Sequence, residues 1–166
     1  MKVKYKFKTK PYKHQQECLE RSWHKENYAL FMEMGTGKSK VLIDNIAMLY
    51  KKDKINFAVV IAPKGVYRNW SEIEIPTHMP DEIKKRVIVW KTKLSKADKD
   101  VLSKRRDYPF YEDLIIFVVN VEAFSSLRGK RLAEWLTSNG YGDKGMIAID
   151  ESTTIKNHKA KRTKTL

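Results

Sequence analysis

Short apolar runs alternate along this chain with stretches whose apolar positions have helical spacing. The runs predict buried strands at residues 28–32, 57–62, 87–90, 114–119 and 146–149. The helical spacing predicts helices at about residues 14–25, 38–50 and 130–138, and a lysine-rich, helical stretch within 91–113. Strands that alternate with helices are typical of an α/β fold with a mostly parallel central sheet and helices on both faces.

Two of the predicted strands differ in the spacing of their apolar residues. Residues 57–62 form the clearest buried strand, and Pro63 ends it because proline cannot continue the hydrogen-bond ladder. Val3, Tyr5 and Phe7 alternate with lysines, which predicts a short edge strand at the start of the chain.

The composition is that of one globular domain. The chain has 166 residues, 42% of them hydrophobic and 33% charged, which suits a single compact core. No apolar run approaches the roughly 18 residues of a membrane span, and the lysine-rich start does not resemble a signal peptide. The single cysteine, Cys18, can form neither an internal disulfide nor a cysteine-rich metal site. We therefore expect a cytoplasmic protein, with a nuclear one as the alternative.

The net charge of +14 is concentrated at the two ends. Residues 1–14 hold six lysines and residues 156–166 hold four lysines and one arginine, with no acid in either stretch. A phosphate backbone is the commonest partner of such basic segments. A solvated surface that keeps the protein soluble is an equally good explanation of the charge alone.

A glycine-rich turn lies between a predicted strand and a predicted helix. It reads Met34, Gly35, Thr36, Gly37, Lys38, Ser39. Glycines let backbone amides point inward, and the helix that follows adds its positive end, so the turn predicts a phosphate site. Lys38 would reach the β- and γ-phosphates and Ser39 would ligate Mg²⁺. The strict phosphate-loop pattern requires glycine where this chain has Met32, and the alternative is an ordinary turn capped by Ser39.

An acidic pair, Asp150 and Glu151, directly follows the run at 146–149. The carboxyl ends of parallel strands are where open α/β sheets bind ligands, so both side chains are expected beside the glycine turn. We assign Mg²⁺ binding to Asp150 and the positioning or deprotonation of the attacking water to Glu151. The alternative is a simple helix cap.

These segments together resemble the superfamily 2 helicase-like ATPases, and within them the Swi/Snf-type translocases. Residues 33–39 look like the first motif of that family, which does not require glycine at the position of Met32. Residues 11–15 are similar to the adenine-recognising motif, with Gln15 as the likeliest reader of the base. The stretch from Asp150 to Asn157 resembles the second ATPase motif, although Ser152 and Thr153 replace the usual Ala-His.

The resemblance also implies a nucleic-acid track and a domain plan. The family motifs that lie along the nucleic-acid backbone match four candidate positions, Pro63, Lys64, Arg68 and Asn120. The chain would be a single N-terminal RecA-like P-loop lobe, residues 1–166, that binds ATP, Mg²⁺ and duplex DNA. The second RecA-like lobe of such a helicase or translocase would be absent, so we expect little or no turnover by this chain alone.

Two other functions stay open on the sequence. A standalone nucleotide- or DNA-binding regulatory module would keep the same loop without motor activity. A small phosphotransferase would need a substrate lid or a guanine-reading motif, and neither is evident in the sequence.

Overall fold

The computed structural model describes residues 5–91, 93–107, 113–124, 127–138 and 144–150. The helices are α1 (Lys13–Ser22), α2 (Lys38–Lys51), α3 (Tyr67–Asn69), α4 (Ile75–His78), α5 (Lys96–Asp107), α6 (Val121–Phe124) and α7 (Leu127–Ser138), with a π-helical turn, η1 (Trp70–Glu74), between α3 and α4. The strands are β1 (Phe57–Ala62), β2 (Lys85–Val89), β3 (Leu114–Asn120) and β4 (Gly145–Ile149).

The described strands form one parallel sheet in the order β2-β3-β1-β4. The two central strands, β1 and β3, are buried along almost their whole length, as their uninterrupted apolar sequences predict. Ala62 is in register with Asn120, and Ile61 with Ile149. The carboxyl ends of β1, β3 and β4 therefore lie at the same edge of the sheet.

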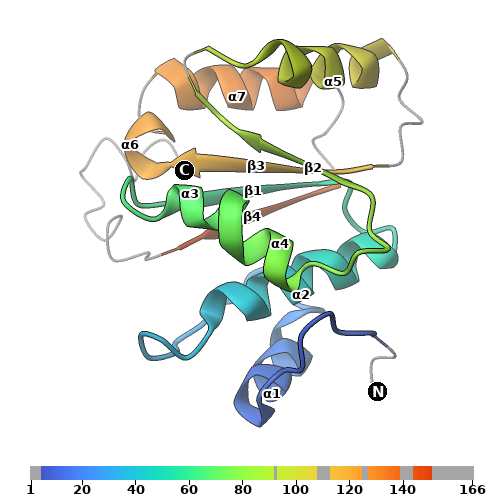
Figure 1. Cartoon of the computed structure of the whole chain (residues 1–166), viewed down its shortest axis with the longest axis vertical. Helices are drawn as coiled ribbons and strands as arrows, with labels where there is room; N and C mark the ends of the chain where they lie inside the picture. The colour runs from blue at the N-terminus through green and yellow to red at the C-terminus, as the bar shows by residue number, and fades with distance from the viewer. Residues whose placement is uncertain (1–4, 92, 108–112, 125–126, 139–143, 151–166) are drawn as a thin grey trace.

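Helices cover both faces of the sheet (Figure 1). On one face α2, η1 and α4 pack against apolar side chains such as Ala58, Val60 and Ile116. On the other face the core contains Phe117, Leu132 and Trp90, contributed by β3, α7 and the end of β2. The α/β prediction with helices on both faces is thus confirmed.

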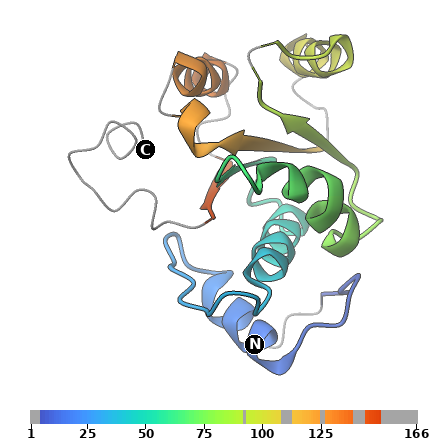
Figure 2. The same cartoon turned by 60° about the vertical axis from the view of Figure 1, so that its left-hand side comes forward.

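The first helix lies outside these layers. Turning the molecule shows α1 beyond α2, away from the sheet (Figure 2). Leu19 of α1 packs with Val41 and Met48 of α2, and Leu30 and Met32 border this small cluster. The segment that leads to the glycine turn is therefore fixed to α1 and α2 rather than to the sheet.

Two strand predictions are wrong within the described residues. Residues 28–32 are irregular and pair with no described strand. Leu30 and Met32 pack inward, but Phe31 is 96% exposed, so the run is not buried on both sides. Tyr5 and Phe7 are likewise irregular, because Tyr5 bonds to Asp44 and packs edge-on against Phe7 instead of pairing with a strand.

No helix in the described ranges is long and apolar enough to cross a membrane. Cys18 is a partly buried free thiol, and burial raises its pKa.

Candidate nucleotide site

The glycine loop, residues 33–37, has a backbone that two glycines make possible. Gly35 and Gly37 have φ values of 78° and 81°, in the left-handed region that residues with a Cβ rarely adopt. The hydroxyl of Thr36 donates to the carbonyl of Glu33 at 2.7 Å and closes the turn. Helix α2 begins at Lys38 directly after Gly37, so its positive end borders the loop.

Lys38 folds back over this loop. Its Nζ donates to the carbonyl oxygens of Met32, at 3.1 Å, and Glu33, at 3.0 Å. Ser39 is partly buried in the first turn of α2, whereas the side chain of Met34 is 89% exposed. Met34 can therefore contribute to an anion site through its backbone rather than through its side chain.

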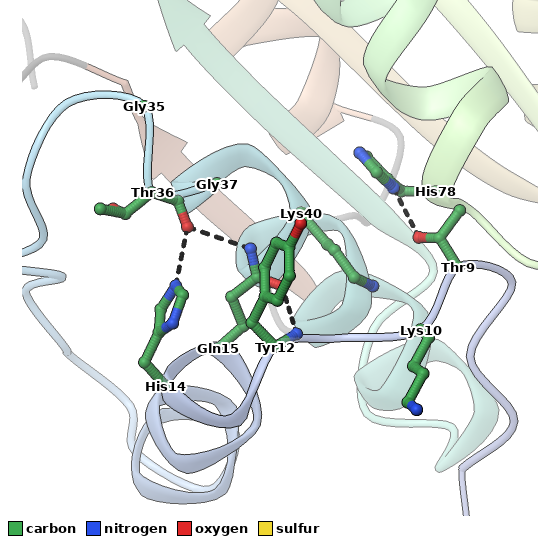
Figure 3. Close-up of a pocket in the computed structure, with 10 residues that line it drawn as sticks. All are labelled: Thr9, Lys10, Tyr12, His14, Gln15, Gly35, Thr36, Gly37, Lys40 and His78. Carbon is green, nitrogen blue, oxygen red and sulfur yellow. Dashed lines mark hydrogen bonds between the residues drawn. The ribbon is translucent and has the colours of Figure 1, made fainter.

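Gln15 joins the first helix to the loop. Its side chain is buried, and its Oε1 accepts a bond from the backbone N–H of Tyr12 at 3.0 Å. Its Nε2 donates to the carbonyl of Thr36, also at 3.0 Å (Figure 3). A Cβ placed on Gly37 would overlap the Gln15 amide nitrogen, so only glycine allows this approach. His14 Nε2 lies 3.0 Å from the same Thr36 carbonyl oxygen.

A cavity of about 400 Å³ opens beside the loop. Its lining includes the predicted residues Gln15, Gly35, Thr36 and Gly37 (Figure 3). The remaining lining residues were not predicted from the sequence and are Thr9, Lys10, Tyr12, His14, Lys40 and His78. Tyr12 and His14 lie within residues 11–15, the segment similar to the adenine-recognising motif. Their closeness to Gln15 in the sequence could therefore have predicted them.

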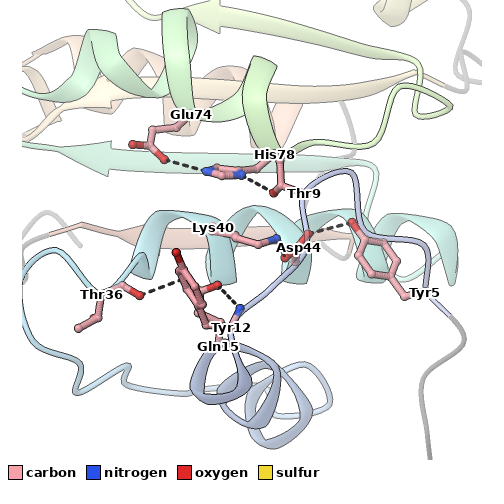
Figure 4. A network of polar contacts seen from close by, with 9 residues as sticks. All are labelled: Tyr5, Thr9, Tyr12, Gln15, Thr36, Lys40, Asp44, Glu74 and His78. Atoms are coloured by element: carbon pink, nitrogen blue, oxygen red, sulfur yellow. Dashed lines mark hydrogen bonds and ion pairs between the residues drawn. The ribbon is translucent and has the colours of Figure 1, made fainter.

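The wall opposite Gln15 is built from two polar networks (Figure 4). In the first, Thr9 Oγ1 lies 2.7 Å from His78 Nδ1, and His78 Nε2 lies 3.8 Å from Glu74. Burial, with a smaller effect of the Lys40 charge, lowers the pKa of His78. The imidazole is therefore held toward its neutral form.

The second network is a buried ion pair. Lys40 Nζ lies 2.7 Å from Asp44 Oδ2, and both side chains are almost fully buried. Tyr5 donates its hydroxyl to Asp44 Oδ1 at 3.2 Å. Burial raises the pKa of Asp44, against the lowering effects of Lys40 and Tyr5. Burial, followed by the Asp44 charge, also raises the pKa of Tyr5. The ion pair lies within α2, and the hydrogen bond from Tyr5 to Asp44 ties the N-terminal segment to this helix.

Asp150 emerges at the carboxyl end of β4, as predicted. Its backbone N–H donates to the carbonyl of Ile61 at 2.8 Å and so continues the parallel ladder. Its Oδ2 accepts a hydrogen bond from the indole Nε1 of Trp70 at 2.9 Å. Burial, and then the charge of Asp150, raises the pKa of the neighbouring Glu74. Glu151 lies outside the described residues.

The predicted nucleic-acid residues gather at the same edge of the sheet. Pro63 follows β1, and its carbonyl accepts bonds from the two amides of Val66 and Tyr67. Lys64 and Arg68 are exposed there. Asn120 ends β3, but its Oδ1 accepts a bond from the Ala123 amide at 2.5 Å and caps α6. The side-chain oxygen of Asn120 thus already has a structural partner.

Two predicted residues, Ser39 and Asp150, offer oxygen ligands of the kind that magnesium binds. Carboxylate and hydroxyl oxygens, which Asp150 and Ser39 offer, are the ligands that Mg²⁺ prefers, and it takes few of them because phosphates and water complete its shell. Among the described residues, no group of three or more His, Cys, Asp or Glu side chains gathers to hold a metal. Neither Ser39 nor Asp150 lines the cavity that Gln15 borders.

Comparison with known proteins identifies the family. A family model described as the SNF2-related domain matches residues 14–166, nearly the whole chain. The chain belongs to the SNF2-related domain family. No curated protein matches it.

Two solved structures resemble this SNF2-related domain in fold. The SWI2/SNF2 ATPase core of Sulfolobus solfataricus, in complex with dsDNA, is 23% identical with a TM-score of 0.65, over 97% of this chain and 30% of that one. A nuclease-deletion mutant of the Type ISP restriction-modification enzyme LlaGI, in complex with a DNA substrate mimic, is 16% identical with a TM-score of 0.52, over 86% of this chain and 17% of that one. The fold is therefore RecA-like, and the chain spans under a third of either relative.

Proposed function

We propose that this chain is the ATP-binding lobe of a DNA-dependent ATPase of the helicase or translocase type. The observation that carries the proposal is the glycine loop. Gly35 and Gly37 curl its backbone at the N-terminus of α2, and Gln15 holds it from α1. Curled backbone amides at a helix N-terminus form an anion site, which suits the phosphates of a nucleotide.

Each residue near the loop has a role in this proposal. Lys38 exchanges the carbonyls of Met32 and Glu33 for the β- and γ-phosphates, since its ammonium already lies over the loop. Ser39 and Asp150 are the magnesium ligands, and Glu151 orients or deprotonates the attacking water. Magnesium, when bound, neutralises charge on the phosphate oxygens.

The chemistry of Gln15 favours adenine as the base. One N–H of its amide and one lone pair of its carbonyl are engaged by Thr36 and Tyr12. The second N–H and the second lone pair match the acceptor N7 and the donor N6 of adenine, whereas guanine presents two acceptors at the same edge. We therefore propose ATP rather than GTP, with the base in the cavity that Gln15 borders.

The DNA partner is proposed from the carboxyl edge of the sheet. Lys64 and Arg68 are exposed beside Pro63 and Asn120, at the edge where Asp150 emerges. Both similar solved structures are complexes with DNA or a DNA mimic. Contacts through these side chains would be to phosphates, so binding should be largely indifferent to sequence.

A second RecA-like lobe is part of the proposal. Phosphoryl transfer commonly needs an arginine from across the cleft, whose contribution is on the order of 10³–10⁵ in rate. We propose that this lobe binds the nucleotide and that turnover requires the second lobe. Phosphate release by the chain alone should then stay near background, with or without duplex DNA.

Displacement of a fluorescent ADP analogue tests the nucleotide class. In the presence of Mg²⁺, ATP and ADP should displace the probe at similar concentrations. GTP should need about 5- to 150-fold more, because an unpaired polar group in the base site costs about 1–3 kcal/mol. Equal displacement by GTP would contradict base reading by Gln15, and no binding of the probe would favour a module that binds DNA alone.

The salt dependence of duplex binding tests the DNA edge. Lys64→Ala should reduce the slope of log affinity against log salt by about 1, since one phosphate contact is lost. Lys54→Ala is the matched control, because Lys54 is also exposed but lies before β1, at the opposite edge of the sheet. An equal effect of the two substitutions would mean that the carboxyl edge is not the DNA surface.

A further inference from the structure

Trp70 is a buried residue whose side chain contacts Asp150 at the carboxyl end of β4. Its side chain is 1% exposed and packs in the core beside Ile75 and Met79. Its Nε1 donates to Asp150 Oδ2 at 2.9 Å, across 80 positions of sequence. The indole is fixed by its packing, so the bond restrains the carboxylate rather than the reverse.

We propose that Trp70 is the positioning residue that orients Asp150 for magnesium binding, an inference that rests on the proposed nucleotide function. The backbone N–H of Asp150 is bonded to Ile61, so the main chain is fixed by the ladder. The side chain still has its own torsions, and the indole bond to Oδ2 restrains them. Oδ1 is the oxygen that the indole leaves for a ligand.

The chemistry of indole suits this task. An indole N–H is a donor only and cannot ligate a metal, so it orients a carboxylate without competing for the ion. Groups that orient metal-binding carboxylates in this way contribute strongly to metal affinity, and their loss costs about 10–100-fold. A buried tryptophan also needs some partner for its N–H, so the bond alone would fit a purely structural role. The experiment must separate these two roles.

The local helix geometry places Trp70 and the cavity on one element. Trp70, Glu74 and His78 follow at intervals of four residues along the continuous run of η1 and α4. Glu74 and His78 lie 3.8 Å apart, and His78 borders the cavity with Thr9 (Figure 4). A π-helical turn covers Trp70–Glu74, and such turns are frequent at functional sites. One face of this run thus contacts both Asp150 and the cavity wall.

Trp70→Phe tests the proposal, because it removes the N–H and keeps an aromatic ring in the core. Calorimetry would measure ADP binding with and without Mg²⁺. In the variant, the affinity gained from Mg²⁺ should fall by about tenfold, while Mg²⁺-free affinity stays within about twofold. Trp90→Phe is the control, since Trp90 is also buried but packs on the other face of the sheet. It should leave the Mg²⁺ effect unchanged.

The outcomes separate the two levels of inference. An unchanged Mg²⁺ effect in Trp70→Phe, with normal binding by the wild type, would overturn the role of Trp70 and leave the nucleotide function standing. No Mg²⁺-dependent binding by the wild type would overturn both. If Trp70→Phe fails to fold, NMR spectra of the wild type with ADP and Mn²⁺ supply the test. Paramagnetic Mn²⁺ bound at Asp150 should broaden the indole N–H signal of Trp70 and not that of Trp23. Broadening of neither signal would overturn the proposal.

Discussion

The side-chain amide of Gln15 donates to the carbonyl oxygen of Thr36, 3.0 Å away, and thereby ties α1 to the glycine loop. The same side chain accepts from Tyr12 N–H at the start of α1. A residue that would read the base is therefore also a support of the loop that would hold the phosphates. Loss of Gln15 should consequently affect both the affinity and the selectivity for nucleotide.

Gln15→Ala should weaken MgADP binding by about tenfold, because one hydrogen bond in a buried setting contributes about 0.5–1.5 kcal/mol and the base contact is lost with it. Fluorescence titration would measure the change. Gln16→Ala is the matched control, since the side chain of the exposed Gln16 donates to Glu20 on its own helix. Equal loss in both variants would show a general effect on α1.

Gly37→Ala should destabilise the fold and abolish nucleotide binding. The left-handed backbone at Gly37 costs a residue with a Cβ about 1–2 kcal/mol, and the Cβ would displace the Gln15 amide. Thermal unfolding should shift down by roughly 2–4 °C per kcal/mol. Gly65→Ala, at a position with ordinary φ and open space, should change neither property. Normal binding by Gly37→Ala would contradict the described loop geometry.

How much of this site the sequence predicts depends on whether the signal is local. The strand at 57–62 and the turn before α2 were predicted because a run of apolar residues and a Gly-x-Gly-Lys pattern are local features. The strand at 28–32 was wrong because apolar residues make a strand only where a neighbouring strand pairs with them. Asp150 was correctly predicted to follow the strand at 146–149, but its bond to Trp70 joins positions 80 apart and has no local signature.

Asn120 shows a second reason why the sequence does not predict the whole site. It was predicted to face nucleic acid from its resemblance to a family motif, and the structure places it at the carboxyl end of β3. Its Oδ1 also caps α6. A side chain that ends a strand and begins a helix has two uses, and the sequence pattern alone does not separate them.

Asp44→Ala should be strongly destabilising, by about 3–5 kcal/mol, because it leaves the buried ammonium of Lys40 without its partner. Urea unfolding would measure the change in free energy. Glu82→Ala removes an equally short pair with Lys51 that is exposed to solvent, and should cost less than about 1 kcal/mol. Similar costs for the two pairs would contradict the burial of Lys40 and Asp44.

His78 should make the stability of the fold depend on pH. Its pKa lies below the ordinary value of 6.5, so the unfolded chain binds this proton more readily than the folded one. The stabilising contribution is complete above that value and is lost as the pH falls through the lowered pKa of the folded state. His78→Asn, which keeps a group able to bond to Thr9, should lose less stability than the wild type between about pH 7.5 and about pH 5. Urea unfolding at both pH values would measure the change. An equal loss of unfolding free energy in the two proteins would contradict this prediction.

Calorimetric titration with MgADP, comparing the wild type with Lys38→Ala, tests the nucleotide site most directly. The Lys38 ammonium donates to the carbonyl oxygens of Met32 and Glu33 at the start of the glycine loop. Lys25→Ala supplies a control at an exposed position after α1. We predict binding by the wild type and by Lys25→Ala, and its loss in Lys38→Ala with unchanged thermal stability. Equal affinity in all three proteins would contradict the account, because the glycine loop would then not be where the phosphates bind.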